Sequence, residues 1–237
     1  MYIPLILLKT TIFIIAYLFI ILNGFSMAIC ILSCYTEKNK NSERSFYMQT
    51  NQNTSSLCDT IRNLTENLEL RSGYLNISDL HFHTEYREIC RQNSCRSYGT
   101  SWACPPAVGT EQECMDRLKS YDKMLLFSKV YQLEDSFDIE GISEGGADFR
   151  RRVETLAQQA GQLLPHYLMM ANGGCRRCES CTYPHSPCRF PDQVFHSMSS
   201  YMFTVSSAAK LAGLAYNNGP DTVTFFGAIL FHENTQT

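Results

Sequence analysis

The segment from Lys123 to Leu133, KMLLFSKVYQL, gives the strongest indication of the fold. It is rich in apolar and aromatic residues over the length of one strand, which is typical of a buried β-strand. A second run of this kind, TVTFFGAILF, extends from Thr222 to Phe231. Between them, apolar residues repeat at helical spacing from Phe149 to Leu164, with Asp148 as the expected N-cap after an acidic loop at 134–147. Interspersed strands and helices favour the α+β class.

Weaker signals complete the expected domain. The sequence TEQE at 110–113 matches a capping box and predicts a helix to about Tyr121. The other expected elements are a weak helix at 58–71, a short strand or extended segment at Leu75–Phe82, a loop at 90–109 and a helix at 204–213. Together they predict a single compact domain over residues 58–237, with a mixed or antiparallel sheet, flanking helices and cysteine-rich metal-binding loops.

Residues 1–34 are strongly apolar, and three interpretations of them remain open. The segment approaches the roughly 20 apolar residues of a transmembrane helix, and its flanking charges would then leave the domain in the cytoplasm. It also has the apolar core of a signal peptide. In the third interpretation it is a translated leader upstream of a true start at Met48. Residues 35–57 are polar and are expected to form a linker.

The composition argues against several classes of function. The chain has 237 residues, a formal net charge of −3 and no basic stripe, so nucleic acid is not an expected partner. It has no recognisable Ser/His/Asp set, glycine-rich phosphate loop or paired-carboxylate motif, so neither hydrolase nor kinase chemistry is expected. Whether the protein is an enzyme at all stays open at this point.

The most informative motif is Cys175-x2-Cys178-x2-Cys181-x6-Cys188, which holds four of the eleven cysteines. Thiolate sulfur is a soft ligand that suits both iron–sulfur clusters and Zn²⁺. The C-x2-C-x2-C core resembles the bacterial ferredoxin run, in which neighbouring cysteines hold one [4Fe–4S] cube. The motif therefore predicts an iron–sulfur site, with a four-cysteine zinc site as the alternative. Disulfides are a further alternative, but such closely spaced cysteines bridge one another poorly.

A second, looser group of cysteines precedes this motif. Cys90, Cys95 and Cys104 form a second tier of candidate metal ligands. Cys114 is the obvious fourth, but it falls on the apolar face of the expected helix and can equally be a core residue. The interpretation of one metal centre or two stays open.

Four segments together resemble a known family, the DUF2284 family of predicted metal-binding proteins. They are CRSYGTSWACPPAVGT at 95–110, YDKMLLFSKVYQLEDSFD at 121–138, GGCRRCESCTYPHSPCRFPD at 173–192 and YNNGPDTVTFFGAILF at 216–231. The resemblance implies a cysteine-rich metal-binding protein, with an iron–sulfur centre expected, and it supplies no established reaction. It implies the same ligands, with Cys175, Cys178, Cys181 and Cys188 first. It includes no membrane segment, which favours Met48 as the start.

These observations lead to one expected function and two alternatives. We expect a cytoplasmic protein that carries a [4Fe–4S] cluster for electron transfer, or as a redox accessory to a partner enzyme. The first alternative is a zinc-stapled structural or interaction module. The second is a secreted or membrane-tethered, disulfide-bonded protein. The expected partner is a redox protein, and contact with a membrane is expected only if residues 1–34 are real and retained.

Overall fold

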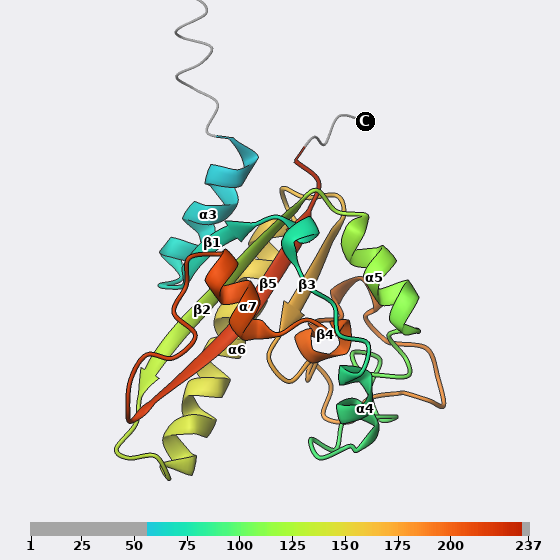
Figure 1. Ribbon diagram of the computed structural model, residues 1–237. Coiled ribbons are helices and arrows are strands. Elements are labelled where there is room, and N and C mark those ends of the chain that lie inside the picture. Colours follow the sequence, from blue (N-terminus) through green and yellow to red (C-terminus); the bar gives the residue numbers. More distant parts are fainter. Residues whose placement is uncertain (1–55, 234–237) are drawn as a thin grey trace, which may run out of the picture. The chain divides into compact units, whose positions relative to one another are not determined.

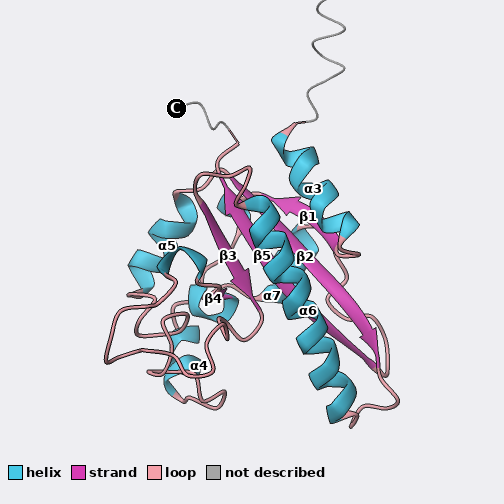
Figure 2. Cartoon of the chain, turned by 180° about the vertical axis from the view of Figure 1, so that it is seen from behind, coloured by secondary structure: helices cyan, strands magenta, loops and turns pink. Residues whose placement is uncertain are grey.

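A computed structural model of the chain describes residues 56–233, and the expectations for residues 1–34 and for 35–55 lie outside this part. A five-stranded sheet runs through the described part and carries helices on both faces (Figures 1 and 2). The helices are α3 (Leu57–Asn67), α4 (Tyr86–Arg91), α5 (Glu111–Lys119), α6 (Ile139–Ala160) and α7 (Val205–Leu211), with short 3-10 turns at η1 (Ile77–Asp79), η2 (Pro191–Gln193) and η3 (Met198–Tyr201). No helix within residues 56–233 is long and apolar enough to cross a membrane.

The sheet is mixed, with the order β1-β2-β5-β3-β4. Its strands are β1 (Arg71–Leu75), β2 (Lys123–Gln132), β3 (Tyr167–Ala171), β4 (His196–Ser197) and β5 (Thr222–Phe231). The two long strands β2 and β5 pair antiparallel along their full length, and only β3 and β4 pair in parallel. The last strand of the chain is therefore the central one. This architecture confirms the predicted α+β class and both predicted long strands.

Successive side chains of the central strands point to opposite faces of the sheet, so each strand contributes to two cores. Leu125 and Phe127 of β2 pack with α3 and α6, which lie across one face (Figure 2). Met124 and Leu126 pack on the other face with α5, α7 and η3. Burial on both faces explains why β2 appears in the sequence as a nearly continuous apolar run.

The long helix α6 begins earlier than the sequence suggests. Its N-cap is Asp138, whose carboxylate accepts a hydrogen bond of 2.7 Å from the Gly141 N–H. The prediction of a loop at 134–147 with Asp148 as N-cap was therefore wrong. Asp148 lies inside the helix and accepts a hydrogen bond from the Tyr131 hydroxyl. Glycine disfavours a helix, but at Gly145 a side chain would lie only 2.9 Å from the Tyr131 ring, so packing against β2 outweighs propensity.

The first strand also lies elsewhere than expected. β1 ends at Leu75 and Ile77–Asp79 form η1, so a strand at Leu75–Phe82 was wrong, although Asn76 and Leu80 on either side of η1 are extended. The strand β3, with the sequence YLMMA, and the helix α4 were not predicted. β3 is rich in Leu, Met and Ala, which favour helices, and its pairing with β5 determines its conformation. In contrast, the Thr110 capping box opens α5 as predicted.

Candidate metal centre

Two loops carry most of the cysteines, and they meet beside the end of the sheet that carries β4 (Figure 1). One loop follows β3 and contains the C-x2-C-x2-C motif, and the other connects α4 to α5. The indole Nε1 of Trp102 donates hydrogen bonds of 3.3 Å to Thr182 Oγ1 and to the Ser186 carbonyl oxygen. The Trp102 ring also meets Tyr183 edge to face, with ring centroids 5.0 Å apart. We call the α4–α5 connection the first cysteine loop and the segment after β3 the second cysteine loop. These contacts hold the two loops together.

The first-tier cysteines lie around one small cavity. The cavity measures about 30 Å³, and all four thiol-bearing residues of the motif line it: Cys175, Cys178, Cys181 and Cys188. Each of them is partly buried, and all nine cysteines within residues 56–233 are free. Ser101 and Trp102 of the first loop line the same cavity. The structure therefore brings together residues that the spacing of the motif had already grouped.

Hydrogen bonds around Cys181 favour the ionised form of its thiol. Burial by itself raises the pKa of this thiol. Hydrogen bonds from the backbone N–H groups of Tyr183 and Trp102, together with the Ser101 hydroxyl, outweigh burial and lower the pKa overall. The first loop thus supplies polar donors to a sulfur of the second, as expected for a metal-ligating thiolate.

Two arginines line the cavity alongside the cysteines. Arg177 lies over the Phe190 ring, with its guanidinium carbon 4.6 Å from the ring centroid. Arg189 donates a hydrogen bond of 3.0 Å from Nη1 to the Ser180 carbonyl oxygen. Both side chains are held within the loop, where their charge can offset that of several thiolates.

The chain enters the cysteine loop through two left-handed glycines, Gly173 and Gly174, with φ of 70° and 67°. A Cβ at Gly174 would lie 3.3 Å from Ala103 Cβ and 3.5 Å from Cys104 Sγ. Glycine is required here both for its backbone conformation and for close packing against the first loop. This close approach places Cys175 next to the first loop.

The second-tier cysteines also approach one another. Cys104 is buried, and burial, followed by the charges of Cys95, Cys90 and Cys175, raises the pKa of its thiol to about 11. The thiol of Cys90 lies 3.9 Å from the Ser199 carbonyl oxygen, and Cys95 is exposed. Among the second-tier cysteines, Cys104 is therefore the one beside the start of the C-x2-C-x2-C motif.

Cys114 has a different environment. It lies on the buried face of α5 and is fully buried in the core. Its sulfur accepts a hydrogen bond of 3.3 Å from Arg87 Nη2 and lies 3.6 Å from the Val108 carbonyl oxygen. These contacts match the core alternative that the helix pattern had left open.

The cysteines of the motif do not surround a common point. As arranged, no group of three or more His, Cys, Asp or Glu side chains in residues 56–233 could hold a metal ion. The four thiols of the motif nevertheless share one cavity, and they match a thiolate-bound centre in kind and number. Binding requires the cysteine side chains to turn toward a common point. The segment that carries them has no regular secondary structure between β3 and η2.

Comparison with known proteins agrees with the site. The model of one protein family, described as predicted metal-binding protein (DUF2284), matches residues 73–231. The chain belongs to this family. The match includes both cysteine loops and every strand except the first residues of β1. No curated protein and no solved structure matches this DUF2284 chain significantly. Metal binding is thus the function predicted for its family, and the family description names no metal.

The sequence alone did not identify the supporting residues of the site. Ser101 and Thr182 are common loop residues, and no pattern marks them. Trp102 packs against Tyr183, and its indole also joins the two loops. Its position two residues before Cys104 was the one available signal.

Proposed function

We propose that the DUF2284 chain holds a [4Fe–4S] cluster on Cys175, Cys178, Cys181 and Cys188 and acts in electron transfer. The observation that carries this proposal is the single cavity lined by all four cysteines. Their C-x2-C-x2-C core has the spacing of ferredoxin ligands, which favours an iron–sulfur cube over a single zinc ion. When bound, such a cluster supplies the capacity to accept and release one electron at a time.

The chain's own residues suit this role. Donors from Tyr183, Trp102 and Ser101 stabilise negative charge on the Cys181 sulfur, and hydrogen bonds of this kind raise the potential of a thiolate-bound cluster. Arg177 and Arg189 line the same cavity and offset the charge of the thiolates. These groups therefore stabilise the added negative charge of a reduced cluster and raise its reduction potential.

The position of the loop suits exchange of electrons with another protein. The cysteines are partly buried, whereas most residues between them, including Arg176 and Glu179, are exposed. A partner that docks on this loop approaches the cluster without any opening of the fold. We accordingly propose a cytoplasmic protein with a redox partner, in which the loop forms part of the contact surface.

A second centre is proposed on Cys90, Cys95 and Cys104. Its support is the mutual electrostatic influence of these thiols and the burial of Cys104. Three cysteines leave one coordination position of a four-iron cube to another group. Cys175 also acts on Cys104, so the two centres would be close neighbours.

Anaerobic purification followed by metal analysis tests the proposal. We expect a brown protein with iron and acid-labile sulfide, absorbance near roughly 400 nm and an electron paramagnetic resonance signal after reduction. Cys178→Ser should lose most of the iron of one cluster. Cys58→Ser is the matched control, because Cys58 lies in α3 and packs with the core on the α6 face, and this variant should keep its iron.

Two other outcomes would replace the proposal. A colourless protein with stoichiometric zinc that is lost in Cys178→Ser would make the site a structural zinc staple. Native protein whose cysteines are mostly oxidised, measured by thiol counting under denaturing conditions without reductant, would indicate a disulfide-bonded protein instead.

A further inference from the structure

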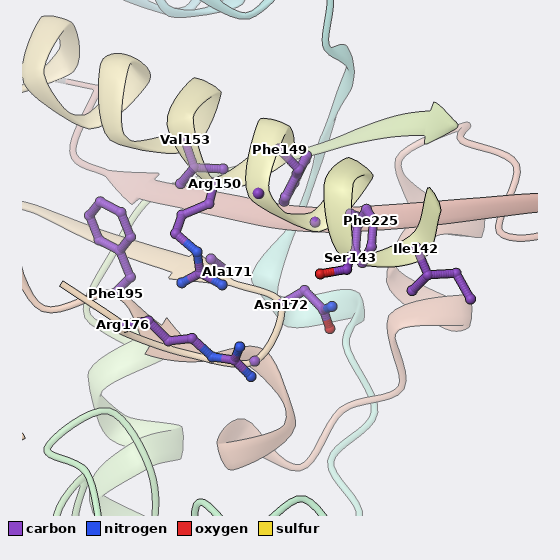
Figure 3. A pocket seen from close by; sticks show the side chains of 13 residues that line it. Ile142, Ser143, Phe149, Arg150, Val153, Ala171, Asn172, Arg176, Phe195 and Phe225 are labelled. Carbon is purple, nitrogen blue, oxygen red and sulfur yellow. The ribbon is translucent and has the colours of Figure 1, made fainter. Parts of the chain in front are cut away.

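A separate cavity lies between α6 and the chain segment that leaves β3 (Figure 3). Its volume is about 360 Å³, at the lower end of the range typical of small-molecule sites. Asn172 and Gly173, which line it, lead directly into Gly174 and Cys175 of the metal loop. The cavity is therefore adjacent to the candidate metal centre, but it is lined by different residues, none of them cysteine.

Two arginines converge on this cavity from different elements. Arg150 projects from α6 and Arg176 from the cysteine loop, and their guanidinium groups extend into the same space (Figure 3). Partial burial lowers the pKa of Arg150, and the positive charge of Arg176 lowers it further. The two groups are thus near enough to repel each other.

No carboxylate neutralises this pair at close range. Within residues 56–233, neither Arg150 nor Arg176 forms a salt bridge or a hydrogen bond, although most other arginines of α6 and α4 do. Glu154, also on α6, acts on Arg150 through its charge without forming an ion pair with it. Arg150 is half-buried and Arg176 is exposed, and an anion held between their guanidinium groups would gain from both charges.

The remaining walls are apolar and aromatic. They are formed by Ile142, Phe149, Val153, Ala171, Phe195 and Phe225. Ser143 and Asn172 add a hydroxyl and an amide at the rim (Figure 3). An anion that fills this space gains from burial of an apolar body as well as from its charge.

We propose that this cavity binds a small organic carboxylate with an aromatic or branched apolar body. Arginine forks match the two oxygens of a carboxylate, and the phenylalanine walls accept the apolar part. Inorganic phosphate fits less well, because it has no apolar body to contact the phenylalanine walls. The inference does not depend on the identity of the metal centre.

Isothermal titration calorimetry on the full chain, purified with its metal, tests the proposal. The probes are phenylacetate, its neutral analogue phenylacetamide, and inorganic phosphate. We expect phenylacetate to bind to one site per chain, and Arg150→Gln and Arg176→Gln each to weaken it by roughly tenfold or more, through loss of charged hydrogen bonds. Phenylacetamide and phosphate should bind at least about tenfold more weakly than phenylacetate.

Arg151→Gln is the matched control. It removes the same charge from the neighbouring position of α6, where the side chain is 69% exposed and paired with Asp148 instead of lining the cavity. This variant should change the affinity by less than about twofold, because exposed charges are screened. Thermal unfolding and metal content of each variant establish that it is folded and loaded.

Three results would overturn the proposal. They are the absence of phenylacetate binding, equal affinity for phenylacetamide, and equal loss of affinity in Arg151→Gln and Arg150→Gln. Tighter binding of inorganic phosphate would reassign the arginine pair to a phosphate ligand. Because calorimetry reports binding directly, each of these results is independent of whether the cysteines hold iron or zinc.

Discussion

The indole nitrogen of Trp102 and the hydroxyl oxygen of Thr182 lie 3.3 Å apart, although 80 residues separate them in sequence. The same hydroxyl donates a hydrogen bond of 2.9 Å to the Pro187 carbonyl oxygen. Thr182 therefore connects the first cysteine loop to the interior of the second, in the stretch between Cys181 and Cys188. A contact of this kind holds ligands in place before the metal binds.

The first prediction concerns this hydroxyl. Thr182→Val keeps the shape of the side chain and removes both hydrogen bonds, so we expect unfolding free energy to fall by about 1–2 kcal/mol. Loss of metal to a chelator should also become faster. Thr222→Val is the control, because the Thr222 hydroxyl bonds the Gly219 carbonyl oxygen away from the cysteines. Equal rates of metal loss in the two variants would contradict the role given to Thr182.

The second prediction concerns the glycine that begins the motif. Gly174→Ala places a Cβ in the left-handed region, at a cost of about 1–2 kcal/mol, and within 3.5 Å of the Cys104 sulfur. Gly213→Ala has nearly the same φ, 70°, but nothing within 4 Å of the new Cβ. Chemical denaturation should show a larger loss for Gly174→Ala, and metal analysis a lower metal content. Similar effects of both changes would mean that packing against Cys104 is unimportant.

The third prediction distinguishes Cys104, a second-tier candidate ligand, from Cys114, which lies in α5. Cys104→Ser should remove the metal of the second centre and leave that of the first, so the metal content per chain falls by about half. Cys114→Ser should keep the metal, because its sulfur contacts Arg87 and Val108 inside the core. Elemental analysis of both variants decides the assignment, and metal loss in Cys114→Ser would return this residue to the ligand set.

Features that depend on neighbouring residues could be predicted from local sequence patterns. The capping box at Thr110 depends on a short stretch of chain and was predicted correctly. The spacing of Cys175 to Cys188 is equally local, and these four cysteines line one cavity. The start of α6 was missed because Gly145 tolerates a helix only through its contact with Tyr131 of β2. That contact is between residues on different elements, and no pattern within either one indicates it.

The same reasoning applies to the site. Cysteine spacing indicates which thiols can act together, but not which distant groups serve them. The link between Trp102 and Thr182, and the convergence of Arg150 with Arg176, arise from the way the loops and α6 fold onto the sheet. Charged and polar residues in loops are usually solvated, so these positions look ordinary in sequence.

The fourth prediction concerns the acid stability of the fold. Arg117 Nη1 donates a hydrogen bond of 2.9 Å to the Tyr201 hydroxyl oxygen, and the Tyr201 hydroxyl in turn lies 2.5 Å from His196 Nδ1. Arginine can only donate, so the Tyr201 oxygen accepts from Arg117, which leaves its proton available to a neutral imidazole. Burial and then the charge of Arg117 lower the pKa of His196 to about 4.

This depressed pKa makes the fold sensitive to acid in a defined range. The unfolded chain takes up a proton on His196 near its ordinary pKa of about 6.5, whereas the folded protein does so only near 4. Between these values the unfolded state binds more protons, so stability falls as the pH decreases from about 6.5 to 4, by up to about 3 kcal/mol. His196→Gln cannot titrate and should show a shallower decline than the parent protein over this range. His185→Gln changes an exposed histidine and should retain the parent slope, as measured by urea denaturation at each pH. Parallel slopes for the parent and His196→Gln would show that the imidazole is not held neutral in the fold.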